Sequence, residues 1–453
     1  MKIVIIGDGK VGSTIARQLS SEGHDIIVID NNPGALENTG DTMDIICLEG
    51  NGCMVSTQKS AGVPHADLLI AATSADEVNL LCCLLGKKLG AKHTIARVRN
   101  PEYYVQMHLL KTELGLSMAV NPESATAQEI SRLLRFPSAL KIEPFARGRV
   151  ELVEIKIQED SRLNGMALRE IYKEFQVKVL VCAVQRHEEV IIPSGDFVLR
   201  GGDKINITAE HIEIERFFRI LGILRNRVHS VMIIGGGRIA YYLAKEMLGI
   251  HVRVKIIEKD KERCEYLCEM LPDAVVIHAD GTDREVLHEE GLEQTDALIT
   301  LTGMDEENIV VGLYGKAKNV SKVIAKVNKI SFREILDHMD IDSFVSPKTI
   351  AANSIVRYVR AMQNSFGSSN VETLHPLVDG QLEAVEFVIK EKSPIVGIPL
   401  KDLKLRKNLL VAMIIRKGRT IIPGGNDTIE VDDGVIVVTG GKPLKDLQEA
   451  LRR

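Results

Sequence analysis

Residues 2–30 read KIVIIGDGKVGSTIARQLSSEGHDIIVID, and this stretch decides the fold. A short apolar run predicts a strand, and a glycine-rich turn, a helix-like segment and a second apolar run ending at Asp30 follow it. Gly7, Gly9 and Gly12 have the G-x-G-x-x-G spacing of a dinucleotide-binding loop. The order strand, glycine loop, helix, strand and acid predicts a dinucleotide-binding α/β fold, the alternative being a glycine turn in another α/β unit.

Each part of this loop has a physical role in holding a dinucleotide. The first glycine permits a tight turn, the second lets the backbone approach a pyrophosphate, and the third lets the helix pack close to the strand. The helix start, at Lys10 and Val11, presents free backbone N–H groups to phosphate charge. Asp30 can accept hydrogen bonds from a ribose diol and would repel a 2′-phosphate, so NAD(H) is favoured over NADP(H).

Composition limits the classes of protein. With 453 residues and 45% hydrophobic content, the chain can form several cores. A net charge of −5 with both signs interspersed gives no electrostatic case for nucleic-acid binding. A strand that begins at Lys2 leaves no room for a signal peptide, and no apolar run approaches the roughly 18 residues of a membrane span. We therefore expect a soluble, cytoplasmic protein. The seven cysteines have no zinc spacing, and no metal site is predicted.

The chain repeats itself. Residues 230–260 read SVMIIGGGRIAYYLAKEMLGIHVRVKIIEKD, which aligns with the opening stretch. The positions that correspond to the first fingerprint are Gly235, Gly237, Arg238, Ile239, Ala240 and Glu258. The fingerprint allows alanine at its third position, and glutamate can bind a diol as aspartate does. A second dinucleotide-binding fold is therefore predicted.

The repeat continues through polar residues at the ends of later strands. Asn51 corresponds to Asp280, and both follow a predicted third strand and could contact the adenosine. Thr73 and Ser74 follow the fourth strand, as Thr302 does in the second half. Open α/β sheets bind ligands at these carboxyl ends. For the two threonines, a role in capping the next helix is an equal alternative.

Arg97 and Lys326 occupy equivalent places on the predicted fifth strands. Both could contact phosphate charge. The alternative is a salt bridge to the facing acids, Asp76-Glu77 in the first half and Asp305-Glu306 in the second.

The fold class predicted is α/β, with two Rossmann-like doubly wound parallel-sheet domains, each followed by a small α+β domain. The predicted domains are 1–140 and 228–370, each with a connector helix, and 141–227 and 371–453, the small ones. Connector helices are expected from Pro122 to about Leu134 and from Pro347 to about Met362. The polar stretch 363–370, QNSFGSSN, is predicted to be a flexible link.

No catalytic constellation is evident. A hydride-transfer enzyme needs a general acid or base near the nicotinamide, and the small domains repeat each other where a catalytic domain would occur once. Tyr241 and Lys245 imitate a dehydrogenase pair but lie in the helix after the glycine loop, where that pair does not belong. The polar residues suit ligand binding without turnover, so a protein that is not an enzyme is predicted.

Several motifs resemble the TrkA family of Trk potassium-uptake systems, which is built from tandem RCK (KTN) domains. They are GDGKVGSTIARQL at residues 7–19 with Asp30, AATSADEVN at 71–79 with Arg97, and the IIP-x-G element in both small domains. The similarity extends from Met1 to about Leu451, in the order RCK N, RCK C, RCK N, RCK C.

The resemblance implies that each N domain binds NAD(H) or an adenine nucleotide, ATP or ADP. The family's first site matches Gly7, Gly9, Gly12, Asp30, Asn51, Thr73 and Arg97, and its second matches Gly235, Gly237, Glu258, Asp280, Thr302 and Lys326. The second site departs from the family pattern at two positions, with Ala240 in place of the third glycine and Lys326 where the first site has Arg97.

The resemblance further implies a regulatory subunit, not an enzyme, that gates a membrane potassium-channel subunit of the TrkH/TrkG kind. Such proteins form rings, here a homotetramer, held peripherally on the inner face of the cell membrane through the partner. The alternatives are an NAD-dependent oxidoreductase and the regulatory part of a different cation-transport system. A nicotinamide oxidation assay and co-purification with membrane proteins would separate these readings.

Overall fold

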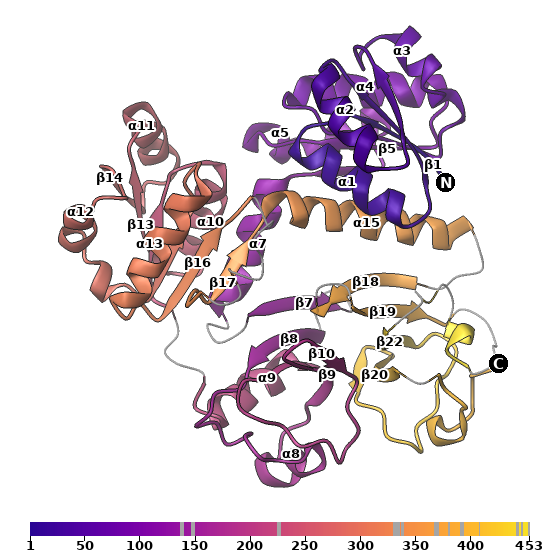
Figure 1. Ribbon diagram of the computed structural model, residues 1–453, viewed down its shortest axis with the longest axis vertical. Coiled ribbons are helices and arrows are strands. Elements are labelled where there is room, and N and C mark those ends of the chain that lie inside the picture. The colour runs from indigo at the N-terminus through magenta and orange to yellow at the C-terminus, as the bar shows by residue number, and fades with distance from the viewer. Residues whose placement is uncertain are drawn as a thin grey trace. The chain divides into compact units, whose positions relative to one another are not determined.

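The computed structural model describes residues 1–453 except 136–139, 146–149, 224–227, 329–335, 337–338, 367–370, 379–380, 390–393, 407, 441–443, 445–446 and 452–453. It contains two six-stranded parallel sheets and two five-stranded antiparallel sheets, which alternate along the chain (Figure 1). The predicted fold class, α/β with two Rossmann-like domains, is confirmed.

The first parallel sheet has the strand order β3-β2-β1-β4-β5-β6. Its strands are β1 (Lys2–Ile6), β2 (Asp25–Asp30), β3 (Ile46–Glu49), β4 (Leu68–Ala71), β5 (His93–Arg97) and β6 (Met118–Val120). The helices are α1 (Lys10–Ser21), α2 (Pro33–Thr42), α3 (Val55–Ser60), α4 (Asp76–Leu89), α5 (Pro101–Val105), α6 (Met107–Leu114) and α7 (Pro122–Arg135). The strand order reverses between β1 and β4, which is the switch point where such sheets bind ligands.

The second parallel sheet repeats this topology as β14-β13-β12-β15-β16-β17. Its strands are β12 (Ser230–Ile234), β13 (Arg253–Glu258), β14 (Val275–His278), β15 (Ala297–Thr300), β16 (Lys322–Lys326) and β17 (Ser343–Val345). The helices include α10 (Arg238–Gly249), α11 (Lys261–Met270), α12 (Arg284–Glu289), α13 (Asp305–Ala317) and α15 (Pro347–Phe366). The central strands of both sheets are apolar and buried because helices cover both faces.

The small domains are antiparallel. The first contains β7 (Lys141–Phe145), β8 (Val150–Lys156), β9 (Leu180–Arg186), β10 (Glu189–Ile191) and β11 (Lys204–Glu210), with α8 (Leu168–Phe175) and α9 (His211–Ile220). The second contains β18 (Val371–Leu377), β19 (Leu382–Val388), β20 (Leu409–Arg416), β21 (Arg419–Ile421) and β22 (Gly434–Gly440). Each has one buried ion pair of the same kind, Arg186 with Asp203 and Arg416 with Asp433.

The chain forms two compact units, and each unit combines equivalent parts of the two halves. Residues 1–131 and 229–356 make one unit, and residues 132–228 and 357–453 make the other. The two parallel-sheet domains therefore contact each other, and so do the two small domains.

Two side-chain contacts join the parallel-sheet domains. Tyr242 at helix α10 donates its hydroxyl hydrogen to the Arg99 carbonyl and accepts a hydrogen bond from the Asn121 amide, at 3.3 and 2.9 Å. Gln18 of α1 donates to Asn353 of α15 at 3.1 Å. Asn121, directly before α7, thus contacts the second parallel-sheet domain, and Asn353 of α15 contacts the first.

One prediction about the connectors was wrong. Residues 363–366, expected to begin a flexible link, continue α15, which extends the second connector beyond Met362. The apolar residues that precede them keep helical spacing, and Val359 and Met362 are buried. The rest of the predicted link, 367–370, lies outside the described residues. Within the described part of the chain, no helix has the length and apolar character that a membrane span requires.

Candidate functional site

The two glycine loops join β1 to α1 and β12 to α10. Gly7 and Gly235 have φ values of 100° and 95°, a left-handed region that favours glycine. A β-carbon on Gly7 would lie 2.8 Å from the backbone nitrogen of Thr73, so the loop packs against the end of the fourth strand. In contrast, a β-carbon on Gly9 or Gly237 would meet nothing within 4 Å. The backbone at the second glycine is therefore open to an approaching group, as the fingerprint predicts.

The helices that follow the loops begin without side-chain caps. The N-caps of α1 and α10 are Gly9 and Gly237, and neither provides a side-chain oxygen for the first N–H groups. The next helices differ, because Asn32 caps α2 and Asp260 caps α11. The first turns of α1 and α10 thus keep N–H groups for an external acceptor, and phosphate is a suitable one.

The side chains in these first turns divide into two kinds. Lys10 and Arg238 are exposed, whereas Val11 and Ile239 are buried in the core. The two apolar residues can therefore meet a ligand only through their backbone N–H groups.

The acids at the ends of the second strands hold the glycine loops. Asp30 accepts hydrogen bonds from the backbone nitrogens of Asp8 and Asn32, at 2.6 and 2.8 Å. Glu258 does the same with the backbone of Gly236 and Asp260, at 2.6 and 2.8 Å. Each carboxylate lies beside its loop at the edge where a ribose would bind, and it also positions that loop. Sequence reasoning anticipated only the ribose role.

The exposed residues after the third strands form local turns. Asn51 Oδ1 accepts the backbone N–H of Cys53 at 2.9 Å. Asp280 Oδ1 accepts both the backbone N–H and the hydroxyl of Thr282, at 2.9 and 2.7 Å. These two hydrogen bonds lower the pKa of Asp280. Asn51 and Asp280 are thus both exposed at the carboxyl edge of their sheets, and each holds the turn that follows its strand.

The threonines after the fourth strands belong to a network that sequence reasoning missed. The Asn79 amide oxygen accepts from the backbone and hydroxyl of Thr73, and its nitrogen donates to the Arg97 carbonyl at 2.9 Å. Asn308 makes the equivalent backbone bonds to Thr302 and Lys326. Both asparagines are fully buried, so each one fastens the end of the fourth strand to the end of the fifth. The repeated asparagines in DEVN and DEEN were the available signal.

Thr73 and Thr302 also bond the residues two positions ahead, which lead into α4 and α13. Their hydroxyls are therefore engaged in the turn, while Ser74 is exposed beside them. The N-cap residues of α4 and α13 are Ala75 and Met304, and no side chain caps either helix, so the threonines shape the preceding turn and do not cap the helices.

The cations of the fifth strands turn inward. The Arg97 guanidinium donates to the Thr73 carbonyl at 3.3 Å, and the Lys326 ammonium donates to the Leu301 carbonyl at 3.2 Å. The salt-bridge alternative for Arg97 was wrong, because the Asp76 carboxylate accepts instead from the backbone of Arg99 and Asn100. Arg97 Nε is buried and has no hydrogen-bond partner, which fits an anion that would bind beside it.

Charges of each half act on the site of the other. Burial, then the charges of Arg99 and Arg238, lower the pKa of Arg97. Burial lowers the pKa of Lys326, and Lys10 of the first half adds to that shift. The exposed cation of each loop thus acts electrostatically on the partly buried cation of the opposite half.

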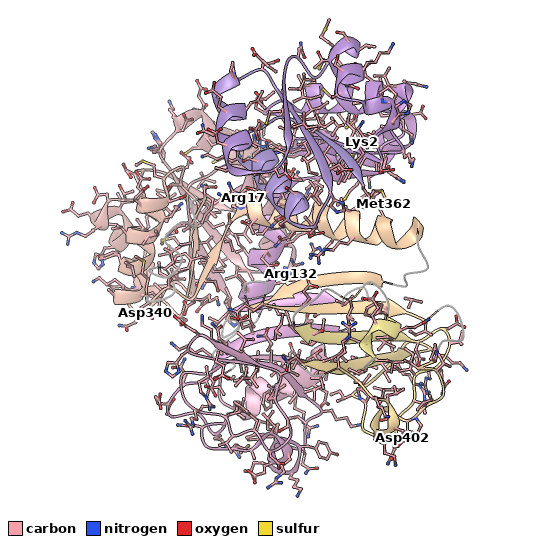
Figure 2. All side chains as sticks on the ribbon, turned by 45° about the vertical axis from the view of Figure 1, so that its right-hand side comes forward. Lys2, Arg17, Arg132, Asp340, Met362 and Asp402 are labelled. Atoms are coloured by element: carbon pink, nitrogen blue, oxygen red, sulfur yellow. The ribbon has the colours of Figure 1, made fainter. Side chains whose placement is uncertain are left out.

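A further cation of the second half is affected by charges of the first half. Lys348 lies in the first turn of α15. Burial, then the charges of Arg17 and Lys10, lower its pKa. Arg17 is on the exposed side of α1 and is labelled in Figure 2. Lys348 of the second half and Lys10 and Arg17 of the first half thus repel one another.

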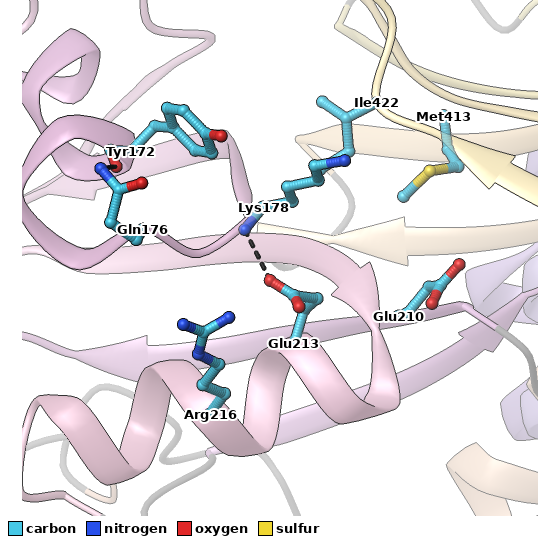
Figure 3. A pocket seen from close by; sticks show the side chains of 8 residues that line it. All are labelled: Tyr172, Gln176, Lys178, Glu210, Glu213, Arg216, Met413 and Ile422. Atoms are coloured by element: carbon cyan, nitrogen blue, oxygen red, sulfur yellow. Dashed lines mark hydrogen bonds between the residues drawn. The ribbon is translucent and has the colours of Figure 1, made fainter.

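The small domains contain an open polar hollow of about 270 Å³ (Figure 3). Its lining residues are Tyr172, Gln176, Lys178, Glu210, Glu213, Arg216, Met413 and Ile422. Glu213 accepts a hydrogen bond from the backbone of Lys178 at 2.7 Å, so its carboxylate is already engaged. Mixed charges on an exposed surface do not select a ligand. Among the described residues, no group of three or more His, Cys, Asp or Glu side chains could hold a metal ion.

Comparison with known proteins agrees with this geometry. The TrkA-N domain family matches residues 3–122 and 231–347, and the TrkA-C domain family matches residues 152–222 and 384–452. A Trk system potassium uptake protein TrkA homolog from Archaeoglobus fulgidus is 33% identical over 452 residues, covering all of both chains. The chain belongs to the TrkA family.

Bacterial TrkA proteins are similar over nearly the same length. The Haemophilus influenzae protein named Trk system potassium uptake protein TrkA is 30% identical, with 98% of this chain and 96% of that chain covered. Both names are those of potassium-uptake proteins and not of enzymes, and the prediction that this TrkA-family chain is not an enzyme is confirmed.

Solved structures share the fold. The structure titled GsuK channel bound to NAD has a TM-score of 0.64 at 18% identity, covering 97% of this chain and 76% of that one. The GsuK RCK domain has a TM-score of 0.63 at 18% identity, with 97% and 92% covered. The fold of this TrkA-family protein is therefore that of tandem RCK domains, whose parallel-sheet parts are of the nucleotide-binding type.

Proposed function

We propose that this protein is the nucleotide-sensing gating subunit of a Trk-type potassium-uptake system. Binding of NAD(H), or of ATP or ADP, at the two glycine loops changes the arrangement of the parallel-sheet domains. That change is transmitted to a membrane potassium-channel subunit of the TrkH/TrkG kind. The GsuK structures titled as bound to NAD and to ADP support both ligand classes by analogy of fold.

The observation that carries the proposal is the pair of open loops, each in a sheet that has a partly buried cation at the end of its fifth strand. Gly9 leaves free space above the backbone, and the helix that starts there has no side-chain cap. Arg97, with a buried unpartnered Nε, lies at the same sheet edge. Asp30 stands at the end of the adjacent strand, where it can accept from a ribose diol. Together these groups fit a dinucleotide, with phosphates at the helix start and a ribose at the acid.

Coupling between the two sites follows from the charges that cross between halves. A phosphate at one loop would neutralise positive charge near Arg97 or Lys326 and so alter the field at the opposite site. A ligand can shift a conformational equilibrium only if it binds the two shapes with different affinity. A coupling free energy of roughly 1–3 kcal/mol is typical of allosteric proteins and suffices to bias a channel.

The proposal includes an assembly. Four domains, at residues 1–140, 141–227, 228–370 and 371–453, form a chain that assembles as a homotetrameric ring. The ring is held at the inner face of the membrane by its channel partner. Through the contacts Tyr242–Asn121 and Gln18–Asn353, a change in the arrangement of the two parallel-sheet domains would move the connector helices.

The experiment that tests the proposal is calorimetric titration of the full chain with NADH and with ATP. Asp30→Ala and Glu258→Ala each disable one site, and about tenfold or greater loss of affinity is expected at that site only, since each acid also holds its loop. Asp25→Ala is the matched control, because Asp25 is an exposed acid at the opposite end of the same strand β2.

Potassium flux through vesicles that contain the channel partner then tests gating. Nucleotide-dependent flux in wild type and none in the double variant would support the proposal. Absence of nucleotide binding to the wild type, or identical flux in both proteins, would overturn it. Co-purification with a different class of cation transporter would overturn the choice of partner alone.

A further inference from the structure

Two free thiols lie close together in the first parallel-sheet domain. Cys53 Sγ and Cys82 Sγ are 3.5 Å apart, although 29 residues separate them in sequence. Cys53 is partly exposed in the turn after β3, whereas Cys82 is fully buried in α4. A disulfide has a sulfur–sulfur distance of about 2.05 Å, so the two sulfurs need to approach by only about 1.5 Å.

The turn that carries Cys53 also carries a residue of the first nucleotide site. The Cys53 backbone N–H donates to Asn51 Oδ1 at 2.9 Å. Between them, the Gly52 carbonyl accepts from Gln58 Nε2 at 2.8 Å, and the same Gln58 nitrogen donates to the Cys82 carbonyl at 3.1 Å. A β-carbon on Gly52 would overlap the side chain of Ile6, so the turn has no free space behind it. A displacement of Cys53 toward α4 therefore displaces Asn51.

We propose that Cys53 and Cys82 are an oxidisable dithiol pair, which a hydroperoxide converts to a disulfide, and that this modification weakens nucleotide binding at the first site. The effect on binding rests on the proposed function. The formation of the disulfide does not.

The chemistry balances with hydrogen peroxide as the oxidant. The sulfur of Cys53, the less buried residue of the two, attacks one peroxide oxygen. The O–O bond breaks, and water and a sulfenic acid form. The Cys82 sulfur then attacks the Cys53 sulfur, the S–O bond breaks, and hydroxide leaves as water with the Cys82 proton. Two thiols and one peroxide thus give one disulfide and two waters. Burial raises the pKa of Cys82, which leaves Cys53 as the sulfur that reacts first.

The second half provides an internal control. The residues equivalent to Cys53 and Cys82 are Thr282 and Val311, so the second turn cannot be cross-linked. The Thr282 hydroxyl donates to Asp280 instead. Oxidation therefore acts on one of two otherwise similar sites, and Cys53→Thr and Cys82→Val are variants that the same fold already accommodates.

The test treats the full chain with hydrogen peroxide, alkylates the remaining thiols and maps disulfide-linked peptides by mass spectrometry. A Cys53–Cys82 peptide that a phosphine reductant abolishes is expected in wild type and in the control Cys268→Ser, whose thiol is exposed. Neither Cys53→Thr nor Cys82→Val should form it. Absence of this peptide from oxidised wild type overturns the proposal, whatever the protein binds.

Titration of reduced and oxidised protein with NADH, in a Glu258→Ala background that leaves the first site, tests the consequence. About tenfold weaker binding after oxidation is expected, which corresponds to loss of roughly one hydrogen bond. Equal affinity of both forms would overturn the regulatory part. Failure of the reduced protein to bind any nucleotide would instead contradict the proposed function, while the peptide map would still decide whether the thiols pair.

Discussion

The two glycine loops have the same backbone arrangement but differ in the side chains that pack behind them. Asp8 and Thr39 are buried at the first loop, where the second has Gly236 and Leu267. In both halves an acid at the end of the second strand, Asp30 or Glu258, holds the loop. An equivalent asparagine, Asn79 or Asn308, joins the ends of the fourth and fifth strands. The contrast teaches that the binding edge is specified by few residues, while the interior behind it is free to be polar or apolar.

A polar interior gives the first site properties that the second lacks. Burial, with a smaller contribution from the charge of Asp30, raises the pKa of Asp8, while the nearby polar side chain of Thr39 opposes that shift. Gln58 spans the turn and α4 by two hydrogen bonds, where the second half has the buried Leu287. The first half thus has a buried carboxyl group and a buried amide at places where the second half has Gly236 and Leu287.

Replacing the buried asparagines tests whether both halves depend on them for stability. Asn79→Leu leaves the Thr73 N–H and the Arg97 carbonyl without their partners, so the free energy of unfolding should fall by about 3 kcal/mol. Asn308→Leu should cost nearly as much, because its backbone bonds are the same. Urea denaturation measures both. Costs that differ by much more than 1 kcal/mol would contradict a common frame.

The two loops also differ at the third position of the fingerprint, which is Gly12 in the first half and Ala240 in the second. Gly12→Ala places a β-carbon against the Gly7 carbonyl oxygen, so we expect a loss of about 2 kcal/mol in stability together with loss of binding at the first site. The second half already has Ala240, fully buried, at this position. The reverse change, Ala240→Gly, should cost only about 1 kcal/mol through helix propensity and leave the second site intact. Full binding by Gly12→Ala would show that the close packing is not needed.

Replacing the cations at the ends of the fifth strands tests which nucleotide each site binds. Arg97→Met removes a buried guanidinium whose Nε has no partner, and about tenfold weaker binding of ATP at the first site is expected. Lys326→Met should weaken the second site similarly. Fluorescence titration with NADH and with ATP measures both. If ATP is affected and NADH is not, the cation contacts a terminal phosphate; unchanged affinity for both would remove Arg97 from the site.

The smallest expected effect is the pH dependence of stability that Asp8 causes. Because the folded pKa of Asp8 is raised, the folded state binds its proton more readily than the unfolded chain does. The contribution of Asp8 to stability should therefore decrease as pH rises from the ordinary carboxyl pKa through the raised value. Asp8→Gly, which copies Gly236, should remove this slope. Urea midpoints of the two proteins across that pH range measure it, and parallel curves would show that Asp8 titrates normally.

Much of the frame was predictable from short-range patterns. The glycine loop with Asp30 predicted the first parallel domain, the internal repeat predicted the second, and prolines 122 and 347 marked where the connector helices begin. These features depend on turn geometry, periodicity and helix starts, which neighbouring residues determine. The end of α15 was placed too early, because a polar Gln-Asn-Ser sequence does not by itself stop a helix that has formed.

The sequence by itself determined the repeated fold, the two loops and the absence of a catalytic group beside them. Only the tertiary structure decided which groups meet: Asn79 with Arg97, Cys53 with Cys82, and Arg238 near Arg97. Each pair is separated by at least 18 residues, and the last lies across the two halves. Such contacts arise from how sheets and domains pack, and no local pattern encodes that distance.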